Sequence, residues 1–217
     1  MIVSHSRKFI FIKTRKVGGT SVEIALSEHC APDDIIGPIK SADERIRVEA
    51  GFLGSQNVFD ENGKQIVHPH DPASRIRELV GKRIWDDYFK FTVERNPWDK
   101  VVSAYYWKYK SGQPAVPFKD WVLSGGGYNV SDFDLYCIEG VLQADFVVRY
   151  EELEQGLSKV YGHIGIDRSP DLARFSAKAG IRPQRDLSTY YDDETREAVA
   201  VRFAREIRLF GWEYPGT

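Results

Sequence analysis

One stretch decides the fold: Phe9-Ile10-Phe11-Ile12-Lys13-Thr14-Arg15-Lys16-Val17-Gly18-Gly19-Thr20-Ser21. Its apolar start ends at a basic turn with two glycines, and an amphipathic segment, residues 22–26, follows at once. This order predicts a buried strand, a loop and the beginning of a helix. Adjacent glycines let the backbone turn sharply and approach a ligand closely. Because the first N–H groups of a helix lack internal partners and the helix dipole is positive there, the turn predicts a phosphate or sulfate site.

The side chains of this turn fit an anion. Lys16 supplies a mobile positive charge, and Thr20 and Ser21 supply hydroxyl donors. An ordinary strand-to-helix turn, capped by Thr20 or Ser21, has the same pattern and stays open as an alternative. The lysine precedes the glycines, whereas the Walker A motif has Gly-x-x-x-x-Gly-Lys-[Ser/Thr]. The loop therefore predicts a phosphate binder that is not an ordinary ATPase.

A second basic element follows another predicted strand, Phe89–Glu94. It reads Arg95-Asn96-Pro97-Trp98-Asp99-Lys100-Val101-Val102-Ser103-Ala104-Tyr105-Tyr106, and Pro97 suits the first turn of a helix. Apolar and aromatic residues recur at helical spacing: Val101, Val102, Tyr105 and Tyr109. Ser103 lies about two helical turns beyond Arg95, so both can hold one phosphate. Either residue alone is more typical of a surface arginine or an ordinary helical serine.

Together the two elements resemble the sulfotransferases that use 3'-phosphoadenosine 5'-phosphosulfate (PAPS). That family has a Pro-Lys-Thr-Gly-Gly-Thr-Ser-like loop for the 5'-phosphosulfate and an Arg-Asn-Pro-x-Asp-x-x-Val-Ser-x-Tyr element for the 3'-phosphate. Residues 95–105 match the second element fully, and residues 16–21 match the first. Residues 145–151 and 190–212 resemble a later strand exit and the closing tail of one branch of the family. This branch contains carbohydrate sulfotransferases and many small bacterial relatives.

The resemblance implies a role for each matching residue. Lys16 is expected to contact the bridging and sulfuryl oxygens, while Arg95 and Ser103 are expected to hold the 3'-phosphate. The expected cradle of the 5'-phosphate consists of Val17, Gly18, Gly19, Thr20 and Ser21. A late basic loop closes over the nucleotide in the family, and Arg182 and Arg185 are candidates for this role. A solvated loop is an equally good interpretation of those two arginines.

Lys16 and Lys13 are both candidates for the lysine that contacts the donor. Arg15 stands where the family usually has proline, and Lys13 lies nearby. The distance along the chain from Lys16 to the glycines agrees with the family, which favours Lys16 over Lys13.

The acceptor hydroxyl needs a general base, and a neutral histidine suits this task near physiological pH. His68-Pro69-His70 precedes a predicted helix, where relatives often place a catalytic histidine in a His-x-x-Ala-like pattern. His70 with Ala73 fits this pattern, so His70 is the first candidate and His68 the second. The alternative is that both histidines only form the beginning of the helix.

Composition limits the other possibilities. With 217 residues, 42% of them apolar, the chain fits one domain, residues 1–217, with a sizeable core. The formal net charge of −2, with both signs spread along the chain, argues against a nucleic-acid-coating protein. Cys30 and Cys137 are expected to be reduced thiols, and no Cys/His spacing suggests a metal site. Without a signal-like segment or a run of membrane-spanning length, a cytoplasmic enzyme is expected, where PAPS is available.

Strands that alternate with helices predict an α/β fold with a parallel sheet covered on both faces. Ligands of such sheets bind beyond the carboxyl ends of the strands, so Lys16, Arg95 and the residues after Val148 are expected to converge. The resemblance implies a three-layer P-loop-like fold with a central parallel sheet. Further expected elements are a hairpin at 57–67, a helix capped by Asp71 that stops at Gly81, and one last helix bearing Val199, Phe203 and Ile207. Acceptor-side insertions are expected near 31–67 and 108–140.

The leading hypothesis is a PAPS-dependent sulfotransferase that acts on an acceptor hydroxyl, on a carbohydrate or glycolipid, without a metal. A P-loop nucleotide kinase or NTPase is the second, but it predicts a Gly-Lys step that is absent. A non-catalytic nucleotide-binding module is the third, and it predicts loss of Lys16 or of the Arg95–Ser103 pair, which are both present. The sequence predicts neither the identity of the acceptor nor the oligomeric state.

Overall fold

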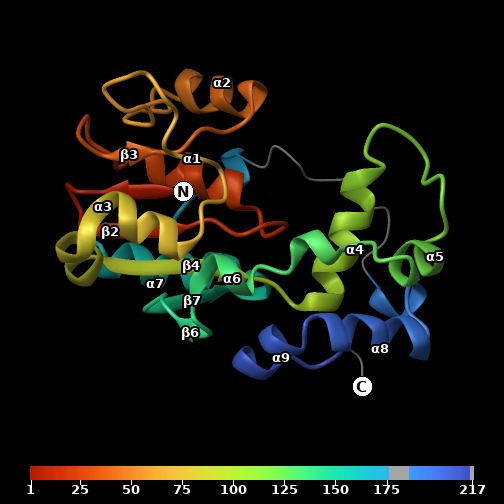
Figure 1. Ribbon diagram of the computed structural model, residues 1–217. Helices are drawn as coiled ribbons and strands as arrows, with labels where there is room; N and C mark the ends of the chain where they lie inside the picture. The colour runs from red at the N-terminus through yellow and green to blue at the C-terminus, as the bar shows by residue number, and fades with distance from the viewer. Residues whose placement is uncertain (176–185, 216–217) are drawn as a thin grey trace. The chain divides into compact units, whose positions relative to one another are not determined.

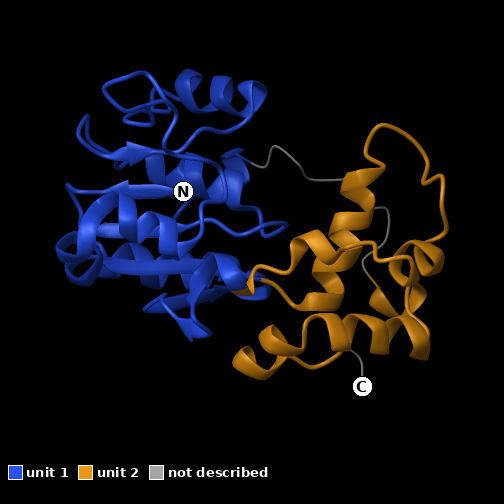
Figure 2. Cartoon of the chain, viewed as in Figure 1, with its two compact units in different colours: residues 1–94, 134–177 blue, residues 95–133, 178–217 orange. Residues whose placement is uncertain are grey.

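The computed structural model describes residues 1–175 and 186–215 (Figure 1). The chain forms two compact units, and it passes between them three times (Figure 2). Unit 1 comprises residues 1–94 and 134–177, and unit 2 comprises residues 95–133 and 178–217. Arg182 and Arg185 lie outside the described residues. Each unit is described by itself below.

Unit 1 is built on a five-stranded sheet with the order β3-β1-β2-β4-β7. The strands are β1 (Ile2–Ser4), β2 (Phe9–Ile12), β3 (Ile35–Ile36), β4 (Phe89–Glu94) and β7 (Phe146–Arg149). β2, β4 and β7 are parallel neighbours, while β1 is antiparallel to both β2 and β3. The sheet is therefore mostly parallel, as expected, and β1 is its antiparallel strand. The connection from β1 to β2 is too short for the crossover that a parallel pair needs.

Aromatic and β-branched side chains explain why these strands form the centre of the unit. All four residues of β2 are fully buried, so both faces of the strand are covered. Phe9 and Phe11 pack with Phe91 of β4, and the rings of Phe11 and Phe91 stack at 5.1 Å between centroids. Val22 and Leu157, from the helices that follow β2 and β7, complete this core. The predicted α/β class, with a central sheet flanked by helices, is confirmed.

The helices of unit 1 are α1 (Gly19–Ser27), α2 (Ser41–Glu49), α3 (Ala73–Asp87) and α7 (Leu153–His163). In the view of Figure 1, α3 lies in front of β2 and β4. The helical conformation of α3 stops at Gly81 (φ 78°, ψ 158°), as predicted, and a second helical segment follows this kink. The chain returns from unit 2 through α6 (Phe133–Tyr136) to a small hairpin, β5 (Cys137–Ile138) and β6 (Val141–Leu142). Short 3-10 turns cover Tyr150–Glu152 and Ala173–Phe175.

The predicted hairpin at residues 57–67 is present as a short pairing. Phe59 pairs with Gln65 in antiparallel fashion, and the N–H of Ile66 donates to the carbonyl of Val58 at 2.8 Å. The 31–67 range, which includes this pairing, also contains α2.

Unit 2 is helical. It contains α4 (Pro97–Lys108), α5 (Phe118–Leu123), α8 (Asp193–Arg202) and α9 (Ala204–Phe210), with 3-10 turns at Tyr128–Val130 and Leu187–Thr189. Its core is aromatic and includes Trp98, Phe118, Trp121, Tyr191 and Trp212. The predicted last helix is in fact two helices, because Phe203 leaves the helical conformation (φ −103°, ψ 22°) while its side chain stays buried in this core. Among the helices in the described ranges, none combines the length and apolar character that crossing a bilayer requires.

Candidate functional site

The loop between β2 and α1 starts from a rigid base. The Thr14 hydroxyl donates to the carbonyl of Val93, and the Thr92 hydroxyl donates to the carbonyl of Ile12 at 2.8 Å. These two hydrogen bonds tie the carboxyl ends of β2 and β4 together. The loop therefore leaves the sheet from a fixed point.

The loop has an uncommon backbone. Lys16 and Gly18 both have positive φ, 61° and 70°, and Gly18 is the N-cap of α1. Glycine adopts this conformation without steric cost, whereas for lysine it is uncommon, and such residues concentrate at ligand sites. The carbonyl of Gly18 accepts from the N–H of Ser21 at 2.9 Å, which starts the helix directly after the turn. The side chain of Lys16 is half-buried at this turn.

The exit of β7 lies beside the same turn. A β-carbon placed on Gly18 would be 3.6 Å from Cε2 of Tyr150 and 3.9 Å from Cδ2 of Leu153. Both of these residues follow β7, and β7 is parallel to β4, which in turn is parallel to β2. Within unit 1, the segments that leave β2 and β7 therefore meet at the carboxyl edge of the sheet, as expected for these two.

Lys13 is held inside unit 1. Its side chain is only 5% exposed and forms an ion pair with Glu23 of α1, which is fully buried and also pairs with the Met1 ammonium. Burial raises the pKa of Glu23, but the two ammonium groups outweigh it and hold this pKa below the ordinary value. Lys13 is therefore buried and engaged by an ionised carboxylate, and the assignment of Lys16 as the lysine of the loop stays a prediction.

The hydroxyls of the turn differ in their surroundings. Ser21 donates its hydroxyl proton to the carbonyl of Phe175 at 2.8 Å, so this group fixes α1 to a neighbouring 3-10 turn. Thr20 is half-buried in the first turn of α1, between Gly19 and Ser21.

The two candidate histidines also differ. Nδ1 of His70 lies 3.1 Å from the carbonyl oxygen of Lys13, at the base of the loop, and the residue is half-buried. The side chain of His68 is 50% exposed and lies 3.6 Å from a carboxylate oxygen of Asp71. The structure therefore brings His70 to the loop and leaves His68 at the surface.

Asp71 does not cap α3 as predicted. Its carboxylate accepts from the N–H of His68 at 2.6 Å and pairs with Arg75 at 3.2 Å, while α3 begins one residue later than expected, after Pro72. With its carboxylate bound to His68 and Arg75, Asp71 lies one residue before the N-cap, which is Pro72.

Unit 2 carries the second sequence motif. Asn96 caps α4 by accepting from the N–H of Trp98 at 3.2 Å, and Pro97 is the first helical residue, as predicted. Arg95 is 8% exposed, and its Nε and Nη2 atoms lie 2.6 and 2.5 Å from one carboxylate oxygen of Asp99. Ser103 is half-buried on α4.

Sequence reasoning missed several residues around the loop: Lys13 as an internal partner, Glu23, Thr14 and Tyr150. A signal was present for Glu23, because it lies between apolar Val22 and Ile24 on a short helix. A carboxylate at such a position needs a cation inside the protein. The local sequence pattern does not identify Lys13 and Met1 as those cations.

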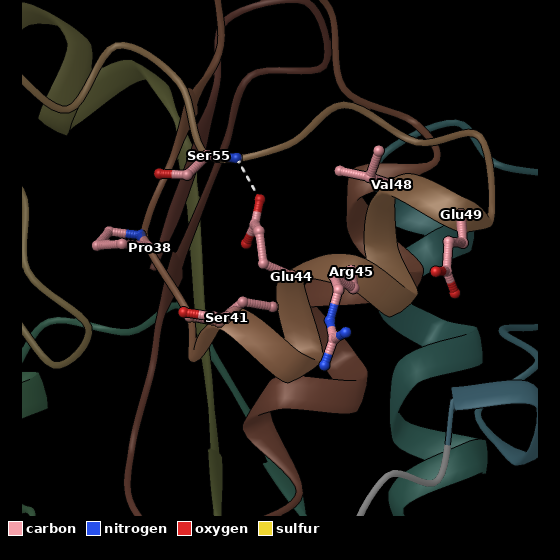
Figure 3. A pocket seen from close by; sticks show the side chains of 8 residues that line it. Pro38, Ser41, Glu44, Arg45, Val48, Glu49 and Ser55 are labelled. Atoms are coloured by element: carbon pink, nitrogen blue, oxygen red, sulfur yellow. Dashed lines mark hydrogen bonds between the residues drawn. The ribbon is translucent and has the colours of Figure 1, made fainter.

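A cavity of about 470 Å³ lies against α2 (Figure 3). It is lined by Pro38, Ile39, Ser41, Glu44, Arg45, Val48, Glu49 and Ser55. A carboxylate oxygen of Glu44 accepts from the N–H of Ser55 at 2.7 Å across it (Figure 3). Another cavity, of about 620 Å³, lies at the start of β4 and β7 beside Phe89, Lys90 and Asp145. Neither is lined by Lys16 or His70.

This chain is similar to several known proteins. An uncharacterised protein of Archaeoglobus fulgidus is 37% identical over 105 residues, which cover 46% of this chain and 88% of that protein. A sulfotransferase crystal structure from Alicyclobacillus acidocaldarius aligns over 95% of this chain and 96% of its own, with a TM-score of 0.46 and 17% identity. The profile of the family described as "Sulfotransferase family" matches residues 1–215. Because this match spans almost all of the 217 residues, the chain belongs to the sulfotransferase family.

Proposed function

We propose that this protein transfers the sulfuryl group of PAPS to an acceptor hydroxyl, on a carbohydrate or glycolipid. Membership of the sulfotransferase family supports the reaction class. One observation carries the proposal furthest: a lysine-bearing turn at a helix N-terminus, Lys16 to Gly19, with His70 hydrogen-bonded at its base. The arrangement joins an anion site and a candidate base in one unit.

The donor is assigned to the two sequence motifs. Lys16 is proposed to neutralise the bridging and sulfuryl oxygens, and the cradle of the 5'-phosphate is proposed to be Val17, Gly18, Gly19, Thr20 and Ser21. Since the Ser21 hydroxyl donates to Phe175, we assign the contribution of Ser21 to its place in the first turn of α1. Arg95 and Ser103 are proposed to bind the 3'-phosphate, with Asp99 holding the guanidinium before the nucleotide arrives. Arg182 and Arg185 stay predictions.

The proposed chemistry is a single displacement at sulfur. The acceptor oxygen forms a bond to sulfur as the bond between sulfur and the bridging oxygen of PAPS breaks. The acceptor proton passes to His70, and adenosine 3',5'-bisphosphate leaves with the bonding electron pair. Lys16 stabilises the charge that develops on the leaving phosphate, the kind of preorganised electrostatic effect that often dominates catalysis. His70 must be neutral to accept the proton.

Two other functions agree less well with the features of the loop. A kinase or other P-loop NTPase is disfavoured because the loop lysine precedes its glycines and no Gly-Lys step follows them. A nucleotide-binding module without catalysis is disfavoured because Lys16 and His70 are both retained at the loop.

The test is incubation of the protein with ³⁵S-labelled PAPS and a panel of saccharides and glycolipids. We expect labelled ester sulfate and adenosine 3',5'-bisphosphate in equal amounts from at least one acceptor, and neither from the Lys16→Ala variant. If the Lys16→Ala variant transferred the label at the wild-type level, the proposed site would be refuted. Absence of transfer to every class of hydroxyl, together with phosphoryl transfer from ATP, would favour the kinase.

Some expectations from the sequence stay predictions. The acceptor is expected to contact residues near 31–67 and 108–140, and the first of these ranges contains the cavity along α2. Catalysis without a metal, a cytoplasmic location, the absence of a nucleic-acid partner and a single domain over residues 1–217 are expected as well.

A further inference from the structure

Lys13 lies at the junction of β2, the loop and α1, and it makes three different contacts there. Its carbonyl oxygen lies 3.1 Å from Nδ1 of His70. Its ammonium group pairs with Glu23 of α1. Its aliphatic chain covers the start of α1, since a β-carbon on Gly19 would lie 3.2 Å from Cγ and 3.4 Å from Cε of Lys13.

The first contact determines where the proton of a neutral His70 resides. A carbonyl oxygen can only accept a hydrogen bond, so Nδ1 of His70 must be the donor. A neutral imidazole carries one N–H, and the lone pair is therefore on Nε2. Nε2 is then the atom that can take a proton from an acceptor hydroxyl.

The other two contacts fix the carbonyl that makes this selection. Lys13 is 5% exposed and Glu23 is fully buried, so water does not compete for the ion pair. Gly19 leaves the space that the aliphatic chain fills. Because the ammonium group and the aliphatic chain of Lys13 are both held in place, the residue has little freedom to rotate its peptide group away from His70.

We propose that Lys13 is a positioning residue, which orients His70 and selects its Nδ1–H tautomer through the carbonyl oxygen. The proposal rests on the proposed function in assigning the base to His70. It gives the buried ion pair of Lys13 with Glu23 a role in the reaction that is separate from nucleotide binding.

Charge balance selects the variant for the test. The buried cluster contains two ammonium groups, of Met1 and Lys13, and the single carboxylate of Glu23. Lys13→Met removes one positive charge and leaves the Met1 amine as a partner of Glu23. Methionine also keeps a flexible chain over Gly19. Lys8→Met is the matched control, because it breaks an exposed ion pair with Asp87 elsewhere in unit 1.

The direct readout is ¹⁵N NMR of the imidazoles in the full chain. The signal of His70, one of five histidines, is identified by its loss in His70→Ala. We expect the Nδ1–H tautomer at His70 in the wild type and in Lys8→Met, and a mixture of tautomers in Lys13→Met. An Nε2–H tautomer at His70 in the wild type would overturn the proposal, even if Lys13→Met failed to fold. An unchanged tautomer in a folded Lys13→Met would overturn it too.

A double-mutant cycle gives the kinetic readout. We expect Lys13→Met to lower kcat roughly 10- to 100-fold, as misplacement of a reacting group does, with little change in affinity for adenosine 3',5'-bisphosphate. In the His70→Ala background the same substitution should change kcat no further. Additive losses would overturn the positioning role. If the wild type transferred no sulfate, the proposed function would fail, and the tautomer measurement would still decide the link between Lys13 and His70.

Discussion

Lys16 carries the positive charge that the proposed reaction needs at the loop. Lys16 lies outside the core and is proposed to stabilise the developing charge of the leaving phosphate, so Lys16→Ala should lower kcat by roughly 10²–10³-fold, the size typical of one lost electrostatic donor. Thermal melting should stay close to that of the wild type. Lys82→Ala, at an exposed lysine that pairs with Asp86 on α3, is the control and should leave turnover unchanged. Near-normal turnover in Lys16→Ala would move the role to another lysine.

His70 is distinguished from His68 by its contact with the loop. His70→Ala should lower kcat by roughly 10²–10⁴-fold, the usual contribution of a general base, while the affinity for adenosine 3',5'-bisphosphate changes little. The wild-type rate should fall in acid, since a protonated imidazole cannot accept a proton, and His70→Ala should lose this acid limb. His68→Ala should be milder in both respects. A dead His68→Ala beside an active His70→Ala would exchange the two roles.

At the scale of single residues, the sequence predicts those interactions whose partners lie close together in the chain. The sequence shows the spacing between Lys16 and the glycines, and between Arg95 and Ser103, because each motif is a short segment. The ion pair of Lys13 with Glu23 spans the loop, and the partner of His70 lies 57 residues away. Such contacts depend on the folded chain, so the sequence left two lysines and two histidines open.

The turn into α1 depends on the backbone of Gly18. With φ at 70°, a β-carbon is strained there, so Gly18→Ala should lower the free energy of unfolding by about 1–2 kcal/mol and weaken donor binding. Gly162→Ala is the matched control. Gly162 lies in α7 with nothing within 4 Å of an added β-carbon, so alanine should stabilise the helix by about 0.5–1 kcal/mol. Chemical denaturation measures both changes, and equal effects of the two substitutions would contradict the strain at Gly18.

The start of α8 should show a charge-dependent stability. Lys119 donates to Asp192 at 2.7 Å and the N–H of Thr195 donates at 2.9 Å, and together they hold the pKa of Asp192 below its ordinary value. A carboxylate with a depressed folded-state pKa stabilises the fold above its unfolded pKa of about 3.9, and this contribution is lost as the pH falls further. Asn can still cap a helix, so Asp192→Asn removes only the charge.

The measurement is thermal melting of both proteins from pH 7 down to pH 3. We expect the wild type to melt above Asp192→Asn at neutral pH, with the difference shrinking below about pH 4. A difference that is independent of pH would show that the charge of Asp192 is unimportant, and the capping geometry alone would then explain α8.

Elements with strong patterns were predicted well. β2 and β4 have the predicted bounds, and α4 begins at Pro97 as expected. β1 was not predicted, because a strand of only three residues shows no clear alternating pattern. α2 was not predicted either, because the composition of this helix is polar. The break at Phe203 was not predicted, because its side chain keeps the helical apolar spacing while its backbone leaves the helical conformation.

At the scale of the whole molecule, the two units are interleaved in the sequence. The chain leaves unit 1 after Glu94 and begins unit 2 with Arg95, the first residue of the second motif. Neither unit is a single continuous segment, so both should form only in the full chain. The family profile likewise extends over residues 1–215.

Nucleotide binding should stabilise the whole protein by mass action. A ligand at about 100 times its Kd adds roughly 2.7 kcal/mol to the free energy of unfolding. We therefore expect adenosine 3',5'-bisphosphate to raise the melting temperature clearly. Arg95→Ala should reduce this rise, since it would remove the charge-assisted hydrogen bond that we propose to the 3'-phosphate. Lys119→Ala, which acts at α8, should lower the melting temperature but leave the rise intact. An identical rise in Arg95→Ala would remove Arg95 from the site.

The central claim, that the two motifs bind PAPS, is tested most directly by calorimetric titration with three nucleotides. These are adenosine 3',5'-bisphosphate, adenosine 5'-phosphate and ATP with magnesium. Binding of PAPS by both motifs predicts that adenosine 3',5'-bisphosphate binds more tightly than adenosine 5'-phosphate by roughly 10-fold or more, the value of one charge-assisted hydrogen bond of about 1.5–3 kcal/mol. It also predicts that magnesium ATP binds weakly. Equal affinity for the first two nucleotides, or tightest binding of magnesium ATP, would contradict it.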